Sequence, residues 1–218
     1  MTGPAEPART VVLLAKAPVA GRVKTRLHSA FSPVDAATLA QAALEDTLAA
    51  MSSTSAIHRV VALEGDPGPW LPPGFDVVAQ PQGGLGVRLA AAFRDMLERA
   101  GHSPALLVGM DTPQLGAPLA AVDFADSDAV LGLTDDGGYW AIGLREADDR
   151  VFDGVPMSTA LTGATQLRRL RDLGLRVRLL PRLRDVDVPD DARAVALAAP
   201  GTRFAAAWRR LADDGAPH

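Results

Sequence analysis

Val11-Val12-Leu13-Leu14-Ala15 is the first apolar run of this chain, and it predicts a buried β-strand. A long loop follows, and a helix is then expected from Ser32, with Pro33 at its first position, to about Met51. Strands and helices continue to alternate along the chain. This order is typical of an α/β fold with a mostly parallel central sheet and helices on both faces.

The remaining apolar runs predict further strands and helices in the same alternation. Strands are expected over 59–63, 75–79, 105–108, 129–133, 139–144 and near 177–180. Helices are expected over about 85–100 and 159–173, and after Pro189 and Thr202. Because domains have roughly 150 residues, a chain of 218 residues is expected to form one domain. Its predicted limits are 10–200, with a disordered tail at 1–9, and with a C-terminal helix packed on the domain and a short tail over 201–218.

Composition excludes several classes of protein. The 22 basic against 26 acidic side chains give a net charge of −4, so nothing favours nucleic acid as a partner. The chain has no cysteine, which excludes disulfides, thiolate metal sites and a cysteine nucleophile. No apolar run reaches the ~18 residues that a membrane span needs, and the N-terminus lacks the apolar core of a signal peptide. We therefore expect a cytoplasmic protein that binds no membrane.

A loop with an unusual charge pattern follows the first predicted strand. No acidic residue occurs from position 7 to position 34, and the basic residues of the loop are Lys16, Arg22, Lys24 and Arg26. The chain has twenty arginines but only two lysines, and both lysines lie in this loop. Lysine offers a compact ammonium group, and several charge-assisted hydrogen bonds together can hold a diphosphate. The loop therefore predicts a phosphate site, with a solvated basic loop as the alternative.

Glycines accompany two predicted loops between a strand and a helix. Gly21 in the basic loop lets the backbone approach a ligand closely. The second loop, 80–88, leads into a helix whose N-terminus can receive an anion or a nucleotide. Its candidate binding residues are Gln80, Gly84, Leu85, Gly86 and Arg88. Neither loop has the Walker or the dinucleotide-binding glycine pattern, and a plain flexible loop is the alternative for the second.

Carboxylates follow two of the predicted strands. Asp111 comes just after the strand at 105–108 and precedes a Thr-Pro pair. Ligands bind at the carboxyl ends of strands in parallel sheets, and a carboxylate there suits Mg²⁺ or Mn²⁺. An aspartate that caps the turn into the next helix is an equally good explanation. Asp185 and Asp187 alternate at another strand end, and therefore lie on one side of that strand.

The stretch Asp135-Asp136-Gly137-Gly138-Tyr139 lies between two predicted strands and includes the only tyrosine of the chain. A hairpin turn explains an Asp-Gly pair without any function, and a candidate site is the other explanation. The four histidines are scattered and no Gly-x-Ser-x-Gly pattern occurs, which disfavours zinc and serine hydrolases.

The order of these motifs resembles that of one bacterial family. The motifs are the segments 14–18, 21–27, 109–113, 136–139, 142–144 and 185–187. Over roughly residues 10 to 195, the chain resembles the glycosyltransferase-A-like (GT-A-like) radical-SAM/selenodomain-associated transferases, which are also linked by name to arsenosugar biosynthesis. The layout also looks like that of 2-phospholactate guanylyltransferase and of the molybdenum-cofactor nucleotidyltransferases. The resemblance implies a single-domain nucleotide-diphospho-sugar transferase fold of the α/β class.

By that resemblance the candidate residues take specific roles. The residues expected to bind nucleotide phosphates are Lys16, Gly21, Arg22, Lys24 and Arg26. The loop at 80–88 would lie near the base or ribose, and Gly137, Gly138 and Tyr139 would also contact the nucleotide. Asp111 and Asp187 would hold Mg²⁺ or Mn²⁺, and Asp136 would be the catalytic base on the acceptor side.

The implied activity is that of a metal-dependent transferase with a nucleotide-activated donor, and a nucleoside-diphosphate sugar is the first expectation. The alternatives are nucleotidyl transfer to a small phosphorylated acceptor and a nucleotide-binding module without turnover. Glycosyltransferases of this fold usually carry Asp-x-Asp at the metal strand, whereas Thr112 and Pro113 follow Asp111 here, which is closer to the nucleotidyltransferase form. Met157 stands where the family usually has Trp. The expected partners are the nucleotide or nucleotide-sugar donor and a small-molecule acceptor, with a homodimer left open.

Overall fold

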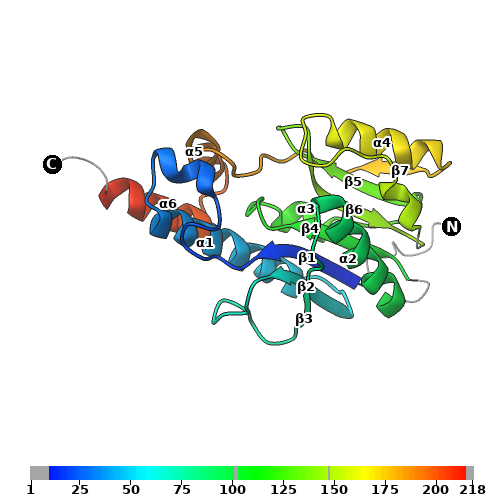
Figure 1. Ribbon diagram of the computed structural model, residues 1–218, viewed down its shortest axis with the longest axis horizontal. Helices are drawn as coiled ribbons and strands as arrows, with labels where there is room; N and C mark the ends of the chain where they lie inside the picture. Colours follow the sequence, from blue (N-terminus) through cyan, green and yellow to red (C-terminus); the bar gives the residue numbers. More distant parts are fainter. Residues whose placement is uncertain (1–9, 101–102, 147, 215–218) are drawn as a thin grey trace.

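The computed structural model describes residues 10–100, 103–146 and 148–214, and its centre is a seven-stranded sheet (Figure 1). The strands are β1 (Thr10–Lys16), β2 (His58–Glu64), β3 (Asp76–Ala79), β4 (Ala105–Gly109), β5 (Ala129–Leu133), β6 (Tyr139–Leu144) and β7 (Val177–Leu179). Their order in the sheet is β3-β2-β1-β4-β6-β5-β7. All pairs are parallel except those that β6 makes with β4 and β5. The expected α/β class with a mostly parallel sheet is confirmed.

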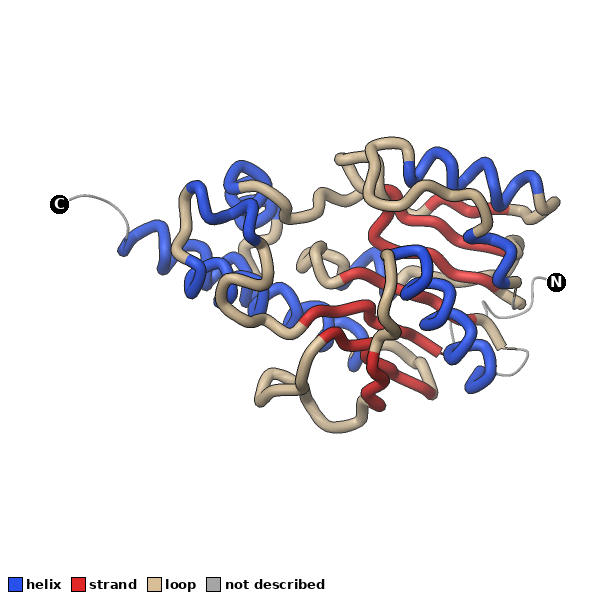
Figure 2. The backbone as a smooth tube through the Cα atoms, in the orientation of Figure 1, coloured by secondary structure: helices blue, strands red, loops and turns tan. Residues whose placement is uncertain are grey.

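Several helices pack against the sheet, and the two C-terminal helices lie beyond one end of it beside the first long helix, as the tube view in Figure 2 shows. The helices are α1 (Pro33–Ser52), α2 (Leu85–Ala100), α3 (Gly116–Ala120), α4 (Thr162–Asp172), α5 (Pro189–Ala198) and α6 (Arg203–Asp214), with the short 3₁₀ helices η1 (Thr25–Ser29) and η2 (Asp149–Phe152). The helix expected from 159 begins instead at Thr162, and residues 156–161 form a loop before it. The sequence did not predict α3, η1 or η2. The tail expected at 1–9 lies outside the described residues.

Alternation along the strands builds one apolar core on each face of the sheet. Leu13 of β1 and Val108 of β4 belong to the core that α1 covers. Val12 and Leu107, one position away on the same strands, belong to the core on the other face, which includes Phe93 of α2. Helices therefore cover both faces, as expected from near-continuous apolar strands.

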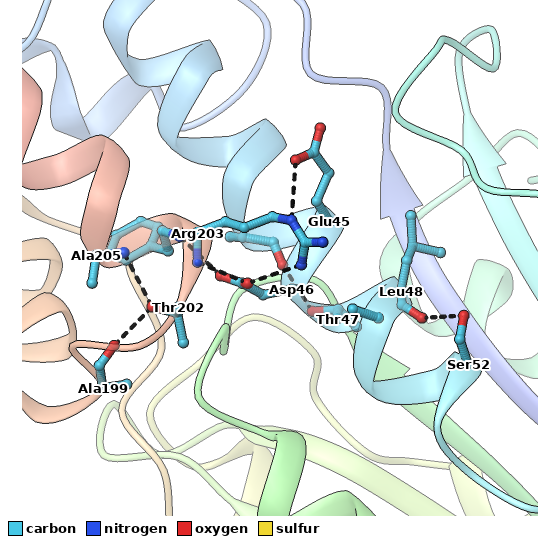
Figure 3. Close-up of polar contacts among 12 residues, drawn as sticks. Glu45, Asp46, Thr47, Leu48, Ser52, Ala199, Thr202, Arg203 and Ala205 are labelled. Carbon is cyan, nitrogen blue, oxygen red and sulfur yellow. Dashed lines mark hydrogen bonds and ion pairs between the residues drawn. The ribbon is translucent and has the colours of Figure 1, made fainter.

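A third apolar cluster joins α1 to the two C-terminal helices. It includes Leu39 of α1, Val195 of α5 and Phe204 of α6. The Asp46 side chain of α1 lies at the start of α6 (Figure 3), and its carboxylate accepts hydrogen bonds from the backbone N–H groups of Arg203 and Phe204, each at 2.9 Å. Burial raises the pKa of Asp46 above its usual value, and the two N–H donors oppose that shift. Asp46 thus caps α6 from another helix.

The topology brings several chain segments to one edge of the sheet. Strands β1 and β4 end there, and β6 begins there because it runs antiparallel to β4. Ligands of open α/β sheets bind beyond the carboxyl ends of the strands, so a ligand site is expected at this edge. None of the helices in the described ranges is both long enough and apolar enough to span a membrane.

Candidate functional site

A cavity of about 610 Å³ opens at this edge of the sheet. Its polar wall contains four aspartates, Asp111, Asp136, Asp185 and Asp187. They come from three places in the fold: the residue two positions after β4, the β5–β6 turn, and the segment before α5. The cavity therefore gathers these four acidic positions, although Asp185 and Asp187 lie in an irregular segment rather than at the strand end that the sequence predicted.

Asp111 and Asp187, the expected metal ligands, lie on one wall of this cavity. The Asp111 backbone carbonyl accepts a hydrogen bond from the Val186 N–H at 2.9 Å, which holds the segment 185–187 beside the end of β4. The Asp111 carboxylate lies 2.5 Å from the Lys24 ammonium, and the Asp187 carboxylate pairs with the Arg26 guanidinium. Each of the two acids thus has a basic partner from the first loop.

Asp185 has a different environment. Burial, together with the negative charges of Asp136, Asp187 and Asp111, raises its pKa to about 6. The four carboxylates are therefore close enough to interact electrostatically. The alternation of Asp185 with Asp187 was visible in the sequence, but only the structure shows that Asp185 is partly buried and lines the same cavity.

The basic loop lines a second cavity of about 240 Å³ next to the first. The basic residues of its wall are Lys16, Arg22, Lys24 and Arg26. The two cavities share Arg26, Met110, Asp111 and Asp187. These cations therefore lie beside the acidic site, and their role in binding phosphate stays a prediction.

Lys24 differs from the other basic residues of the loop. Its side chain is only 9% exposed, and its ammonium donates a hydrogen bond to the Val186 carbonyl in addition to its contact with Asp111. Its backbone lies in the left-handed region, with φ 48°. A non-glycine residue in that region is uncommon, and here the fixed backbone directs the side chain inward.

The loop at 80–88 contributes less to the cavity than the sequence predicted. The Gln80 amide donates to the backbone carbonyls of Ala15 and Ala62, at 2.7 and 2.8 Å. Arg88 pairs with Glu64 at 2.8 Å, and Glu64 also pairs with Lys16 at 2.9 Å. Gln80 and Arg88 therefore tie the loop to the ends of β1 and β2. Of the residues expected to bind from this loop, which were Gln80, Gly84, Leu85, Gly86 and Arg88, only Leu85 lines the large cavity.

Asp136 is part of a tight turn as well as of the cavity wall. Its Oδ1 accepts hydrogen bonds from the Thr134 hydroxyl at 2.6 Å and from the Gly138 N–H at 2.8 Å. Gly137 has φ 91°, and a Cβ there would lie 2.1 Å from the Ala160 carbonyl oxygen. The hairpin explanation of this stretch is therefore correct, and it leaves the second oxygen of Asp136 for another contact.

Tyr139 begins β6 and lines the cavity. Its hydroxyl donates to the Met157 sulfur at 3.9 Å, and burial raises its pKa above the usual range. Met157 lies in the loop before α4, where Ser158 also has a positive φ of 58°. Sequence reasoning missed several lining residues, namely Leu14, Leu89, Leu107, Thr134, Ser158, Thr159 and Thr162. The apolar ones gave no signal, because a strand or helix residue that lines a cavity has the same apolar character as one in the core.

The donor set fits a hard divalent cation that also binds phosphate. Mg²⁺ is commonly held by one or two carboxylates together with phosphate oxygens of the substrate. Asp111 and Asp187 supply such carboxylates, and Asp185 faces the same cavity. Within the part of the chain that the structure describes, no group of three or more acidic or histidine side chains could hold a metal by itself. The site therefore suits a metal that the substrate phosphates help to bind.

Comparisons with known proteins identify a family and a similar protein. Residues 36–159 match the family described as "Uncharacterized protein conserved in bacteria (DUF2064)". Phosphoenolpyruvate guanylyltransferase from Streptosporangium roseum is 32% identical to this chain over an alignment 217 residues long. The alignment covers 93% of this chain and 91% of that protein.

Two solved structures resemble this chain in fold. A proposed nucleotide-diphospho-sugar transferase from Desulfovibrio desulfuricans G20 superposes with a TM-score of 0.81 at 26% identity, over 92% of this chain and 94% of that one. The inositol-1-phosphate CTP transferase from T. maritima shares the fold alone, with a TM-score of 0.52 at 14% identity over 89% and 96% of the two chains. The expected nucleotide-diphospho-sugar transferase fold is confirmed.

Proposed function

The chain belongs to the bacterial family DUF2064 and is a transferase, and from that premise we propose that it moves a nucleotidyl group from a nucleoside triphosphate to a small phosphorylated acceptor. One observation carries the proposal: a basic cavity and an acidic cavity share the wall made by Arg26, Asp111 and Asp187. The donor phosphates would lie on the basic side and the acceptor on the other side. The reacting atoms would then meet at the two shared carboxylates.

Lys16, Arg22 and Arg26 would bind the donor phosphates, with Gly21 allowing close backbone approach. Asp111 and Asp187 would hold Mg²⁺ or Mn²⁺, and Asp185 adds a third carboxylate on the same cavity. The metal would neutralise charge on the transferred and departing phosphates. The protein's own part is to position the two substrates.

In this reaction an oxygen of the acceptor phosphate attacks the α-phosphorus of the triphosphate. The bond from that phosphorus to the β-phosphate bridging oxygen breaks, and pyrophosphate leaves. The second pKa of a phosphate monoester is about 6, so the attacking oxygen already carries its charge at neutral pH and needs no base. Asp136 would then stabilise the β5–β6 turn through its hydrogen bonds, rather than act as the base that sugar transfer would require.

Sugar transfer was the first expectation from the sequence. Two observations favour nucleotidyl transfer instead. The relative that covers 93% of this chain is a guanylyltransferase, and guanosine triphosphate is therefore the first donor to test. In addition, Thr112 and Pro113 follow Asp111 where sugar transferases of this fold usually have Asp-x-Asp. No observation favours a binding module without turnover.

The test is pyrophosphate release from GTP, CTP, ATP and UTP with phosphoenolpyruvate and other small phosphate esters, with Mg²⁺ or Mn²⁺ present. We expect Asp111→Asn to lower kcat/KM at least about 100-fold. We expect Asp136→Asn to stay within about threefold of the unchanged protein, whereas loss of a general base would cost roughly 10²–10⁴-fold. Consumption of nucleotide sugars without any pyrophosphate release, together with a large loss in Asp136→Asn, would overturn the proposal in favour of sugar transfer.

A further inference from the structure

Arg26 and Asp187 form an ion pair at the junction of the two cavities. The Arg26 guanidinium pairs with the Asp187 carboxylate, and both residues line both cavities. The proposed function gives Arg26 a donor phosphate to bind and gives Asp187 a metal. Each of the two side chains is thus paired with the other, whereas binding of phosphate and of metal requires both.

The backbones of both residues are held in place, so a change of partner falls to the side chains. Leu27 follows Arg26, Val186 precedes Asp187, and both apolar residues are buried in the cluster that joins α1, α5 and α6. The Asp187 N–H also donates to the Asp191 carboxylate at 3.3 Å. The Arg26 side chain, by contrast, is 72% exposed. Exposed side chains change rotamer within nanoseconds, so Arg26 can turn from the carboxylate to the basic cavity without movement of the backbone.

Lys24, which contacts the other expected metal ligand, is held differently. Its ammonium lies 2.5 Å from the Asp111 carboxylate, and it also donates to the Val186 carbonyl. Its side chain is nearly buried, so two partners and the surrounding atoms fix it together. Arg26 is exposed, and its guanidinium contacts the Asp187 carboxylate from the solvent side of the site. The ion pair that opens most easily is therefore that of Arg26 with Asp187.

An exchange of partners is favourable because the new contacts are stronger than the ion pair that they replace. An exposed ion pair contributes little, since water screens it and two flexible side chains must be ordered. A guanidinium binds phosphate through two parallel hydrogen bonds, and a carboxylate binds Mg²⁺ by direct coordination. Either ligand alone, however, must break the ion pair and leaves one of its two side chains without a partner. The two ligands together leave neither unpaired.

We propose that Arg26 exchanges partners as the site fills: it leaves Asp187 for the donor phosphates in the basic cavity, and Asp187 then coordinates the metal. Donor and metal therefore bind with positive coupling, and each raises the affinity for the other by the same factor. This inference rests on the proposed function for the roles of the two cavities, but not on which group is transferred.

The first test measures metal binding in the absence of phosphate. The probe is Mn²⁺ alone, titrated into the unchanged protein and into Arg26→Gln and followed by electron paramagnetic resonance of the free ion. We expect Arg26→Gln to bind Mn²⁺ about two- to fivefold more tightly, because the metal no longer has to break an exposed ion pair to reach Asp187. An unchanged Kd for Mn²⁺ would overturn the proposal.

Loss of any positive charge near four carboxylates favours a cation, so a matched control is needed. Arg184→Gln removes the same charge from the residue next to Asp185 in the chain. Arg184 pairs with Asp135 and Asp191, which line neither of the two cavities. We expect its Kd for Mn²⁺ to stay close to that of the unchanged protein. A gain in Arg184→Gln equal to that in Arg26→Gln would mean that net charge alone is at work, and the proposal would be wrong.

The second test measures phosphate binding without metal. The probe is inorganic pyrophosphate with a chelator present, titrated calorimetrically. Asp187→Asn releases Arg26, so we expect it to bind pyrophosphate several-fold more tightly than the unchanged protein. The same substitution is then made in Arg26→Gln, where most of this gain should disappear, because contacting residues are energetically coupled. A gain of equal size in both backgrounds, or no binding of pyrophosphate by any of the four proteins, would contradict the exchange.

Neither test involves turnover or a nucleoside, so their outcome is independent of the reaction that the protein catalyses. Tighter Mn²⁺ binding by Arg26→Gln, together with the loss of coupling to Asp187, would support the exchange even if no nucleoside triphosphate released pyrophosphate. That second result would count only against nucleotidyl transfer. Conversely, pyrophosphate release with uncoupled binding would leave the proposed function in place and remove the exchange.

Discussion

Lys24 joins three chain segments at the junction of the two cavities. Its ammonium contacts the Asp111 carboxylate after β4 and the Val186 carbonyl before α5, while its backbone belongs to the first loop. Its side chain is nearly buried, whereas Arg22 of the same loop is exposed. The structure therefore gives Lys24 a role in holding the site together, in addition to any contact with phosphate.

Lys24→Met should lower the free energy of unfolding by about 1.5–3 kcal/mol, because it removes a charge-assisted hydrogen bond and leaves the Val186 carbonyl and Asp111 without their partner. Arg22→Met should change it by less than about 0.5 kcal/mol, as for an exposed surface residue. Urea denaturation of the ligand-free proteins measures both. Equal stability of the two variants would show that Lys24 does not hold these segments.

Individual candidate residues could be predicted from the sequence only where their chemistry is unusual for their position. The placement of both lysines in one loop led to Lys16 and Lys24, and a carboxylate after a buried strand led to Asp111. Gln80 was assigned to the nucleotide because sequence alone does not show that its amide is used by two backbone carbonyls. Leu107 gave no signal, because its exposure to a cavity depends on packing.

At the scale of elements, a two-point ion pair joins the residues that directly precede the paired strands β5 and β7. Arg176 donates to the Asp128 carboxylate through Nε at 2.9 Å and Nη2 at 2.8 Å. Hydrogen bonds from the Arg176 side chain and backbone hold the pKa of Asp128 at about 2, below its usual value of 3.8. A carboxyl whose folded pKa is depressed stabilises the fold above its unfolded pKa, and that stabilisation is lost as pH falls through the window from about 4 to 2.

Asp128→Asn should therefore be less stable than the unchanged protein at pH 7, by up to about 1 kcal/mol because the pair is partly exposed. The difference should shrink as the pH falls from 4 toward 2. Thermal unfolding over that range measures it, with Asp66→Asn as the control, since Asp66 is exposed in the loop after β2. A difference that stays constant with pH would mean that the charge of Asp128 does not stabilise this edge.

Long elements with a clear period could be predicted from the sequence, and short ones could not. The limits expected for α2, β5 and β6 agree with the structure, since each is a sustained apolar pattern. The five-residue α3 has too few residues to show a helical period. The hairpin turn accounts for the antiparallel pairing of β6 with β5, whereas the pairing of β6 with β4, which is farther away in the sequence, is not specified by the pattern within either strand.

At the scale of the whole molecule, the third apolar cluster supports the site from behind. Leu27 and Val186, both fully buried, belong to this cluster together with residues of α1, α5 and α6. Leu27 follows Arg26, and Val186 separates Asp185 from Asp187. The C-terminal helices therefore fix the backbone that presents one basic and two acidic residues to the cavities. Nothing in the local sequence of these helices indicates this connection.

Asp46→Ala tests whether the C-terminal helices support the site. It removes the carboxylate that caps α6 from α1, and loss of such a cap costs about 1–2 kcal/mol. If α6 supports the cluster that holds Leu27 and Val186, the variant should also bind nucleotide and Mg²⁺ several-fold more weakly.

Asp148→Ala is the matched control, because it removes the cap of η2, which packs against α2 and α4 instead. Both variants should lose stability, measured by thermal unfolding, but only Asp46→Ala should lose affinity in a titration with GTP. Equal affinities in the two variants would show that the site does not depend on the contact between α1 and α6.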